Sequence, residues 1–260
     1  MERLRTEQPK GLTRASLRKW GMLFVILGIF GRAILQTRFL GVATLTNDEL
    51  LSALSEAPEA MLFATFALVL QFVECCAAPI FSFLLAEGFA HTSDKNKYLL
   101  RVVGVAILSE IPYNFAFGAK FFDMSSRNPA FGIAVALVVL YLYDYLKEKN
   151  LRNILMKLFV TVAAFVWCGM LGIEGGICSL VITLAFWSFR KKPMVRNLVA
   201  GAASMVGCLF SMFYMAAPMG MLVVHFYNGE KGEEKRLLSY LFYPAALTMI
   251  GIAGYIAFGF

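Results

Sequence analysis

Apolar runs long enough to cross a lipid bilayer dominate the sequence, and short polar loops separate them. The longest run covers residues 60–89, and further runs follow up to residue 260. Hydrophobic residues make up 59% of the chain, whereas soluble domains contain roughly 45–50%. A transmembrane helix needs ~20 apolar residues, and a folded domain of this length cannot bury so large an apolar excess. The sequence therefore predicts an all-α, polytopic transmembrane helix bundle.

Lysine and arginine gather in short clusters between the apolar runs, and this pattern predicts the topology. Basic loops of membrane proteins stay in the cytoplasm. We expect residues 1–19 to be a basic cytoplasmic segment. Residues 20–260 then form a single polytopic domain of about nine spans, within a range of eight to ten. Nine spans require a break in residues 198–227, near 216–220, whereas one long helix there leaves about eight.

The net charge of +7 comes from these loops, so we expect the lipid bilayer as partner and no nucleic acid. The charge pattern predicts a multi-pass membrane protein with its N-terminus in the cytoplasm. The loop 41–59 is acidic and is expected outside. In that loop Thr46 or Asn47 is expected to cap a short helix with Glu49 in its first turn.

Local patterns also predict where helices bend and end. The run 60–89 exceeds the length of one span, and Pro79 is the expected position of a kink. The glycines of residues 172–176 predict a tight turn between two spans. Arg32 and Arg38 lie near the far end of the first span and are expected to snorkel to the membrane interface.

Several classes of site are excluded by residue counts and spacing. The five cysteines lie inside apolar runs, and none has the C-x-x-C spacing of a zinc site. Only two histidines are present, which excludes a multi-histidine metal site. The chain has no GxSxG motif, phosphate-binding glycine loop or dinucleotide fingerprint. We therefore expect no metal and no bound cofactor.

Ionisable side chains gather in residues 79–114, where two apolar runs are joined by one short polar turn. Glu87 and His91 are four residues apart and share one face of the first helix. Glu110 and Asn114 have the same spacing on the second helix. A charge at the middle of a membrane helix costs about 2.5–3.5 kcal/mol on insertion scales, so such groups face the bundle interior.

Two interpretations of this polar hairpin stay open. Glu87 is either a general base or substrate anchor, or it pairs with Arg101 across the turn and ties the two helices together. His91 is either a base or an interfacial, capping side chain. Glu74 lies in the outer half of its helix and is expected to approach Glu110.

Three stretches resemble the core of a known family. They read PIFSFLLAEGFAHTSDKNKYLLR, ILSEIPYN and RNPAFGIAVALVVLYLY, and they follow one another within residues 79–145. In this pattern the chain resembles the TraX family. Its members are polytopic membrane proteins named for F-pilin acetylation and grouped with transmembrane acyltransferases. The weaker matches FWSFRKK, FYNGEKG and YLFYP extend the resemblance over most of the chain after residue 70.

The resemblance implies an acetyl- or acyltransferase that moves an acyl group from acyl-CoA to an amine or hydroxyl acceptor. Acyl-CoA enters as the donor substrate, and the resemblance also implies the cytoplasmic (inner) membrane of a bacterium as the location. His91 or Glu87 is then the catalytic base, since acyl transfer normally uses a histidine or a carboxylate. Arg101 is expected to hold an anionic group of the donor. The other polar positions of the matched region are expected to bind substrate: Glu110, Asn114 and Asn128.

The chain departs from the family where polar groups are expected. The first span of the family typically ends in an Asp–His pair, and this chain has Gly28 and Ile29 there. An arginine is expected at Cys75, a histidine at Ala246 and an aspartate at Met170. Two alternatives therefore stay open. One is a non-catalytic membrane binding or assembly protein that has lost the acyltransferase histidines. The other is a small-molecule or lipid transporter that uses intramembrane glutamates.

Overall fold

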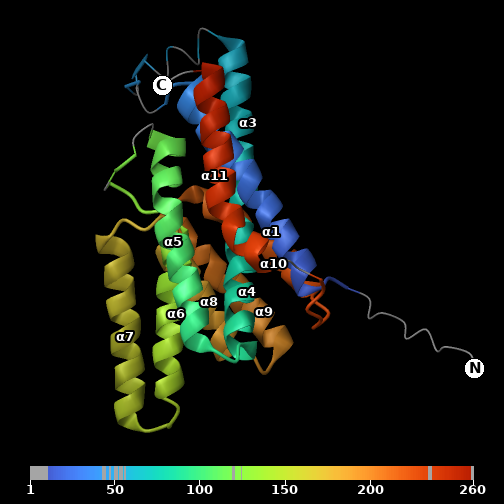
Figure 1. The fold of residues 1–260 in the computed structure, drawn as a ribbon, viewed down its shortest axis with the longest axis vertical. Coiled ribbons are helices and arrows are strands. Elements are labelled where there is room, and N and C mark those ends of the chain that lie inside the picture. The colour runs from blue at the N-terminus through green and yellow to red at the C-terminus, as the bar shows by residue number, and fades with distance from the viewer. Residues whose placement is uncertain are drawn as a thin grey trace, which may run out of the picture.

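The computed structural model is a bundle of helices (Figure 1). It describes residues 11–42, 45–46, 48–49, 52, 55, 57–118, 121–123, 125–233 and 236–258. Within these ranges the regular secondary structure is helical, and two isolated β-bridges accompany it. The predicted all-α fold class is confirmed. The helices in chain order are α1 (Arg14–Ile29), η1 (Phe30–Phe39), α3 (Pro58–Cys75), α4 (Ala77–His91), α5 (Lys95–Gly118), α6 (Ala130–Tyr145), α7 (Leu151–Met170), α8 (Gly176–Ser188), α9 (Pro193–Ser204), η2 (Met205–Leu209), η3 (Met212–Met219), α10 (Gly220–His225) and α11 (Arg236–Phe258).

The described helices group into long and short apolar segments. Five are long and apolar enough to cross a membrane: Arg14–Phe39, Pro58–His91, Lys95–Gly118, Leu151–Met170 and Leu238–Phe258. Four are shorter: Ala130–Tyr145, Gly176–Ser188, Pro193–Leu209 and Met212–His225. Five long and four short segments agree with the count of about nine that the apolar runs predict.

The region 198–227 is broken, as predicted, but the expected position at 216–220 is wrong. That stretch lies within η3 and the start of α10, and the chain reverses at residues 210–211 instead. Gly207 lies directly against the ring of Tyr214, where a Cβ atom would overlap it. A glycine there lets the two arms of the hairpin approach closely, so packing decides where the chain turns.

The long run 60–89 is interrupted one turn before Pro79. α3 ends at Cys75 and α4 begins at Ala77. Proline has no N–H group and cannot donate a hydrogen bond to the carbonyl four residues earlier, which here belongs to Cys75. The interruption therefore follows from the position of the proline, near which a kink was expected.

The predicted start of a short helix in the acidic loop is confirmed at Thr46. The backbone N–H and the hydroxyl of Thr46 each donate to the Glu49 carboxylate at 2.8 Å. The N–H of Glu49 donates in return to the Thr46 hydroxyl at 3.4 Å. These reciprocal bonds form a capping box, and the N–H of Thr46 lowers the pKa of Glu49. Asn47, the alternative cap, lies outside the described residues.

α4 is the central helix of the lower half of the bundle in Figure 1, where it contacts α6, α8, α9 and α10. Its side chains Ile80, Phe83 and Phe89 are fully buried. Phe83 packs with residues of α8 and α10, whereas Phe89 packs with residues of α6 and α8. The first helix of the predicted polar hairpin is therefore part of the core.

α7 lies at the edge of the bundle (Figure 1) and presents apolar side chains outward. Those exposed along its length include Leu155, Leu158, Phe159, Val162 and Trp167. A continuous exposed apolar face of this kind is unfavourable in water. It is typical of a helix that faces lipid, which agrees with the membrane assignment.

Candidate functional site

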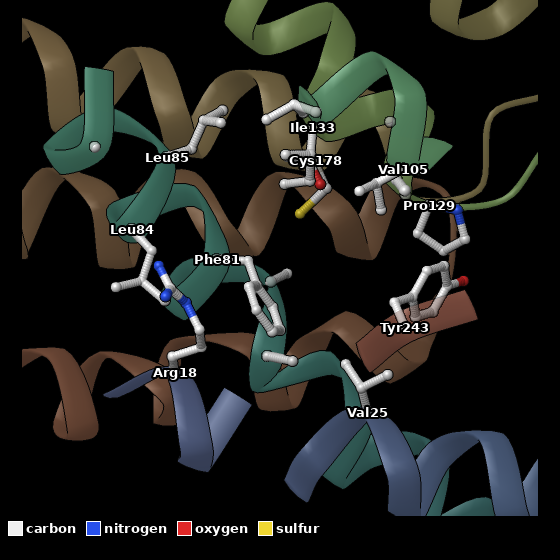
Figure 2. Close-up of a pocket in the computed structure, with 18 of the residues that line it drawn as sticks. Arg18, Val25, Phe81, Leu84, Leu85, Val105, Pro129, Ile133, Cys178 and Tyr243 are labelled. Atoms are coloured by element: carbon white, nitrogen blue, oxygen red, sulfur yellow. The ribbon is translucent and has the colours of Figure 1, made fainter. Parts of the chain in front are cut away.

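A large cavity lies inside the bundle, between helices that are far apart in the sequence. Its volume is about 1350 Å³, which exceeds the roughly 300–1,000 Å³ of most ligand pockets. Helices α1, α4, α5, α6, α8 and α11 contribute to its wall (Figure 2). The middle of the cavity is apolar, and Figure 2 shows these side chains grouped around Phe81 of α4: Val25, Leu84, Leu85, Val105 and Ile133.

One end of the cavity is basic. It is formed where α4 ends and where α1, α5 and α11 begin. The N–H of Arg14 donates to the Glu230 carbonyl at 2.8 Å, which places the start of α1 beside the loop before α11. We name this end the basic mouth, and its cationic side chains are Arg14, Arg18, Lys97, Arg101 and Lys231. An excess of positive charge at an opening attracts an anionic ligand.

The basic mouth also contains the carboxylate of Asp94, in the loop between α4 and α5. The backbone N–H of Lys97 donates to Asp94 Oδ1 at 2.9 Å and lowers the pKa of Asp94. Asp94 therefore stays ionised at neutral pH, and its bond to Lys97 caps the first turn of α5.

The other end of the cavity carries a group of polar side chains that we name the inner cluster: Arg32, Glu74, Tyr113 and Glu174. Arg32 Nη1 lies 2.6 Å from Glu174 Oε1. The hydroxyl of Tyr113 donates to Glu174 Oε2, also at 2.6 Å. The Arg32 guanidinium lies 4.3 Å from the centre of the Phe117 ring, which adds a cation–π contact. Both carboxylate oxygens of Glu174 are therefore occupied.

Glu74 is the second carboxylate of the inner cluster, and it lines the cavity. Within the part of the chain that the structure describes, no hydrogen bond or ion pair reaches it. The charged groups that act on it are Arg32 and Glu174, which are bonded to each other. Gly28 of α1 faces Glu74, and a Cβ atom at Gly28 would overlap the carboxylate. The glycine therefore leaves the space that Glu74 fills.

The polar surface continues one turn beyond the inner cluster. Gln36 follows Arg32 by four residues, and Gln71 precedes Glu74 by three. Gln71 Nε2 donates to Gln36 Oε1 at 2.7 Å. Arg32 and Gln36 lie in the π-helical segment η1, and π-helical turns are rare and frequent at functional sites. Within the described ranges, no group of three His, Cys, Asp or Glu side chains stands together as a metal site requires.

Glu174 is held by the predicted tight turn between α7 and α8. Gly172 and Gly175 have φ angles of +58° and +61°, in the left-handed region that favours glycine. The backbone of Arg127 pairs with this turn. Its N–H donates to the Gly172 carbonyl, and the N–H of Glu174 donates to the Arg127 carbonyl, each at 3.0 Å. The loop before α6 therefore fixes the position of Glu174.

Three of the six predicted site residues line the basic mouth: Glu87, His91 and Arg101. The Tyr227 hydroxyl donates to Glu87 Oε1 at 3.2 Å, and His91 Nδ1 lies 3.7 Å from the same oxygen. The expected Glu87–Arg101 ion pair is wrong. Glu87 faces Tyr227 and the charge of Arg196, and Arg101 makes no ion pair with any described residue.

The other three predicted residues are not among those that line the cavity. Glu110 accepts a bond from Arg127 Nη1 at 2.9 Å and another from Asn128 Nδ2 at 2.6 Å. Asn128 Nδ2 also donates to the Ala106 carbonyl at 2.9 Å. Asn114 is buried in α5. Their role in substrate binding stays a prediction, and in the structure Glu110 and Asn128 fasten α5 to the loop that holds the α7–α8 turn.

The inner cluster is absent from the sequence-based predictions. The expectation that Arg32 snorkels is wrong, because it pairs with Glu174 inside the bundle. The expectation that Glu74 approaches Glu110 is also wrong, since Glu110 binds Arg127. One available signal was that Arg32 and Glu74 are isolated charges within apolar runs, which normally face the bundle interior.

Most positions where the family resemblance leads us to expect polar groups lie near the inner cluster, whereas Met170 is exposed at the end of α7. Gly28 lies against Glu74, and Cys75 lines the cavity beside it. Ile29 and Ala246 belong to one buried apolar cluster. Apolar packing therefore occupies the expected histidine positions, and a different set of polar side chains stands next to them.

Comparison with known proteins gives a family match and a distant relative. The family model described as TraX protein matches residues 50–253. A protein of Dichelobacter nodosus named "Probable fimbrial assembly protein FimC, serogroup H1" is 25% identical over 204 residues, which cover 70% of this chain and 81% of that protein. No solved structure matches. The family match includes Glu74, Glu174 and the α4 and α5 side of the basic mouth.

Proposed function

From the premise that this chain belongs to the TraX family, we propose that it is a membrane acyltransferase that moves an acyl group from acyl-CoA to an amine or hydroxyl acceptor. The observation that carries the proposal is the cavity. It joins the basic mouth to a buried carboxylate through an apolar passage. Acyl-CoA has an anionic nucleotide end, an uncharged arm and a reactive thioester. These three parts match the basic mouth, the apolar passage and the buried carboxylate in the same order.

The basic mouth suits the nucleotide end of acyl-CoA. The phosphates of coenzyme A are strong acceptors, and lysine and arginine bind phosphate through charge-assisted hydrogen bonds. Arg101 lines the mouth, and no described acidic residue pairs with its guanidinium. Its five donors therefore remain available for a phosphate. The pantetheine arm carries no charge and suits the apolar passage around Phe81.

The basic mouth is proposed to open to the cytoplasm of a bacterium, from the inner membrane. The α6–α7 and α8–α9 turns lie in the lower part of Figure 1, as does the junction of α4 and α5. Those turns carry the lysines and arginines that the positive-inside rule places in the cytoplasm. A reporter fused after residue 260 is expected to read as external, and a cytoplasmic reading would contradict this topology.

A non-catalytic role in membrane assembly is the second candidate. The relative from Dichelobacter nodosus is named a fimbrial assembly protein. Ile29 and Ala246 are packed in an apolar cluster, at positions where the acyltransferase resemblance leads us to expect histidines. A protein with this role needs no acyl donor, so the two candidates differ in whether acetyl-CoA is bound and consumed.

Transfer of label from [14C]acetyl-CoA distinguishes the two candidates. We expect the purified protein in detergent to move label into membranes of the producing bacterium and to release the thiol of coenzyme A. An extract prepared in the same way from cells without the gene is the control. If the protein transfers no label and isothermal titration detects no binding of acetyl-CoA, the assembly role is the better account.

Replacing Arg101 with alanine is expected to raise the KM for acetyl-CoA roughly 10- to 100-fold, since a hydrogen bond to a charged group contributes about 1.5–3 kcal/mol. The kcat is expected to stay unchanged, because the lost contact binds the donor and the transition state equally. Arg152→Ala is the matched control, as Arg152 is exposed on α7 and does not line the cavity. An unchanged KM in Arg101→Ala would remove Arg101 from the donor site.

The cavity offers a base at two places. His91 and Glu87, the pair predicted from sequence, lie at the basic mouth, whereas Glu74 lies in the inner cluster. Nδ1 of His91 lies 2.9 Å from the Glu87 carbonyl oxygen. A carbonyl only accepts, so this contact makes Nδ1 the donor and leaves Nε2 as the basic nitrogen. Unchanged transfer in His91→Ala would exclude His91 as the base.

A further inference from the structure

We infer that Glu74, rather than Glu87 or His91, takes the proton from the acyl acceptor. The inference rests on the proposed acyltransferase function and identifies where in the cavity the reaction takes place. Three observations carry it: the length of the cavity, the absence of a partner for Glu74, and the ion pair beside it.

The first observation is the length of the cavity. Glu74 and Glu87 both line it, and they lie roughly 20 Å apart along α3 and α4 at 1.5 Å per residue. The arm of coenzyme A between its diphosphate and its sulfur has about as many bonds as the backbone of four residues, which when extended spans ~13–14 Å. A donor held by its phosphates at the basic mouth therefore presents its thioester in the inner half of the cavity. Glu87 and His91 then lie beside the phosphates.

The second observation is the bonding of the two carboxylates. Glu87 accepts a hydrogen bond from Tyr227 and has His91 beside it. Glu74 has no hydrogen bond or ion pair within the described part of the chain, and it faces the cavity. An uncompensated carboxylate inside a helix bundle is costly. Such a group is typical of a functional site, where its lone pairs are used by a substrate N–H or O–H.

The third observation is that Arg32, the cation of the inner cluster, is paired with Glu174 and not with Glu74. Arg32 is bound to Glu174 at 2.6 Å, and Tyr113 binds the other oxygen of Glu174. A guanidinium bonded directly to Glu74 would make that carboxylate a weak base. Glu174 holds Arg32 instead, so Glu174 acts as a positioning residue that keeps Glu74 available. The glycine at position 28 keeps the space that the carboxylate occupies.

Acyl transfer can proceed with Glu74 as the group that accepts and returns the proton. The acceptor nitrogen or oxygen attacks the thioester carbonyl carbon, and Glu74 takes the proton that the acceptor loses. The carbon–sulfur bond then breaks and coenzyme A leaves as a thiolate. The thiolate takes the proton from Glu74, which restores the carboxylate and releases the free thiol.

The test compares Glu74→Gln with Glu59→Gln, an exposed carboxylate near the start of the same helix. We expect kcat for [14C]acetyl-CoA transfer to fall ~10²- to 10⁴-fold in Glu74→Gln, with KM for acetyl-CoA within twofold of the wild type. Glu74→Asp is expected to recover part of the rate, and Glu59→Gln to keep all of it. In the wild type we expect kcat to rise with pH as the catalytic base loses its proton. In Glu74→Gln this rise is expected to be absent.

Thermal unfolding shows whether Glu74→Gln loses activity without losing structure. Removal of an uncompensated buried charge is expected to raise the Tm by about 2–4 °C.

Glu87→Gln and His91→Ala are expected to change the KM for acetyl-CoA more than kcat, because both residues lie beside the donor phosphates at the basic mouth.

The inference is overturned if Glu74→Gln keeps kcat within threefold of the wild type, or if its loss of rate comes with a fall in Tm. A wild-type protein that neither binds nor consumes acetyl-CoA would instead contradict the proposed function itself.

Discussion

Acyl transfer is expected to slow roughly 10- to 100-fold when Glu174 is replaced with glutamine, although Glu174 is not the base. The substitution removes the charge that holds Arg32 at 2.6 Å. Arg32 then turns to Glu74, the other carboxylate of the inner cluster. A hydrogen bond between charged groups of about 1.5–3 kcal/mol has to be broken before Glu74 can accept a proton. The expected loss of rate follows from that free energy.

The measurement is kcat for [14C]acetyl-CoA transfer by Glu174→Gln and by the double variant Arg32→Gln/Glu174→Gln. The double variant removes the cation that captures Glu74, so we expect it to be faster than Glu174→Gln alone. This coupling is the signature of one shared network. Wild-type kcat in Glu174→Gln, or a double variant no faster than Glu174→Gln, would show that Glu174 does not keep Arg32 away from Glu74.

Replacing Glu110 with alanine is expected to destabilise the protein by about 3 kcal/mol, because it removes the carboxylate that a partly buried arginine and an asparagine share as an acceptor. Glu110 accepts three bonds, from Arg127 Nη1 and from the backbone and side-chain nitrogens of Asn128. The Glu110 and Arg127 side chains are only 17% and 24% exposed. For a chain of this size the loss corresponds to a fall in Tm of about 6–12 °C.

Circular dichroism of the protein in detergent during heating measures this effect. The double variant Glu110→Ala/Arg127→Ala is expected to recover part of the Tm, since it no longer leaves an unpaired cation. Glu59→Ala serves as the control for loss of an exposed carboxylate. A change in Tm of 2–4 °C corresponds to about 1 kcal/mol for a chain of this size. If Glu110→Ala has a Tm within about 2 °C of the wild type, this contact does not fasten the loop before α6.

Features of the fold that depend on neighbouring residues could be predicted from the sequence. The lengths of the apolar runs predicted the helical segments, because crossing a bilayer sets a minimum number of apolar residues. Pro79 predicted the interruption of the long run, and the glycines at 172 and 175 predicted the turn that carries Glu174. The hairpin near residue 210 was misplaced, since contact between Gly207 and Tyr214 decides where it turns.

Three residues that line the basic mouth were predicted because they are close to one another in sequence. Glu87 and His91 are one helical turn apart, and Arg101 follows after a short loop. The direction of Glu87 was not predicted, since its partner Tyr227 is 140 residues away. Glu110 and Asn128 were predicted to bind substrate, but whether they face the cavity depends on how α5 and the loop before α6 pack against their neighbours, and neither lines it.

The sequence by itself determined that this chain is a membrane helix bundle of the TraX pattern with charges inside it. Burying a charge in a bundle requires a partner or a cavity, but this requirement does not say which residue supplies it. Arg32 and Glu174 are 142 residues apart, and their contact exists only because η1, α3 and the α7–α8 turn meet at one end of the cavity. Tertiary packing alone therefore decided that Glu174 is paired and that Glu74 faces the cavity without a partner.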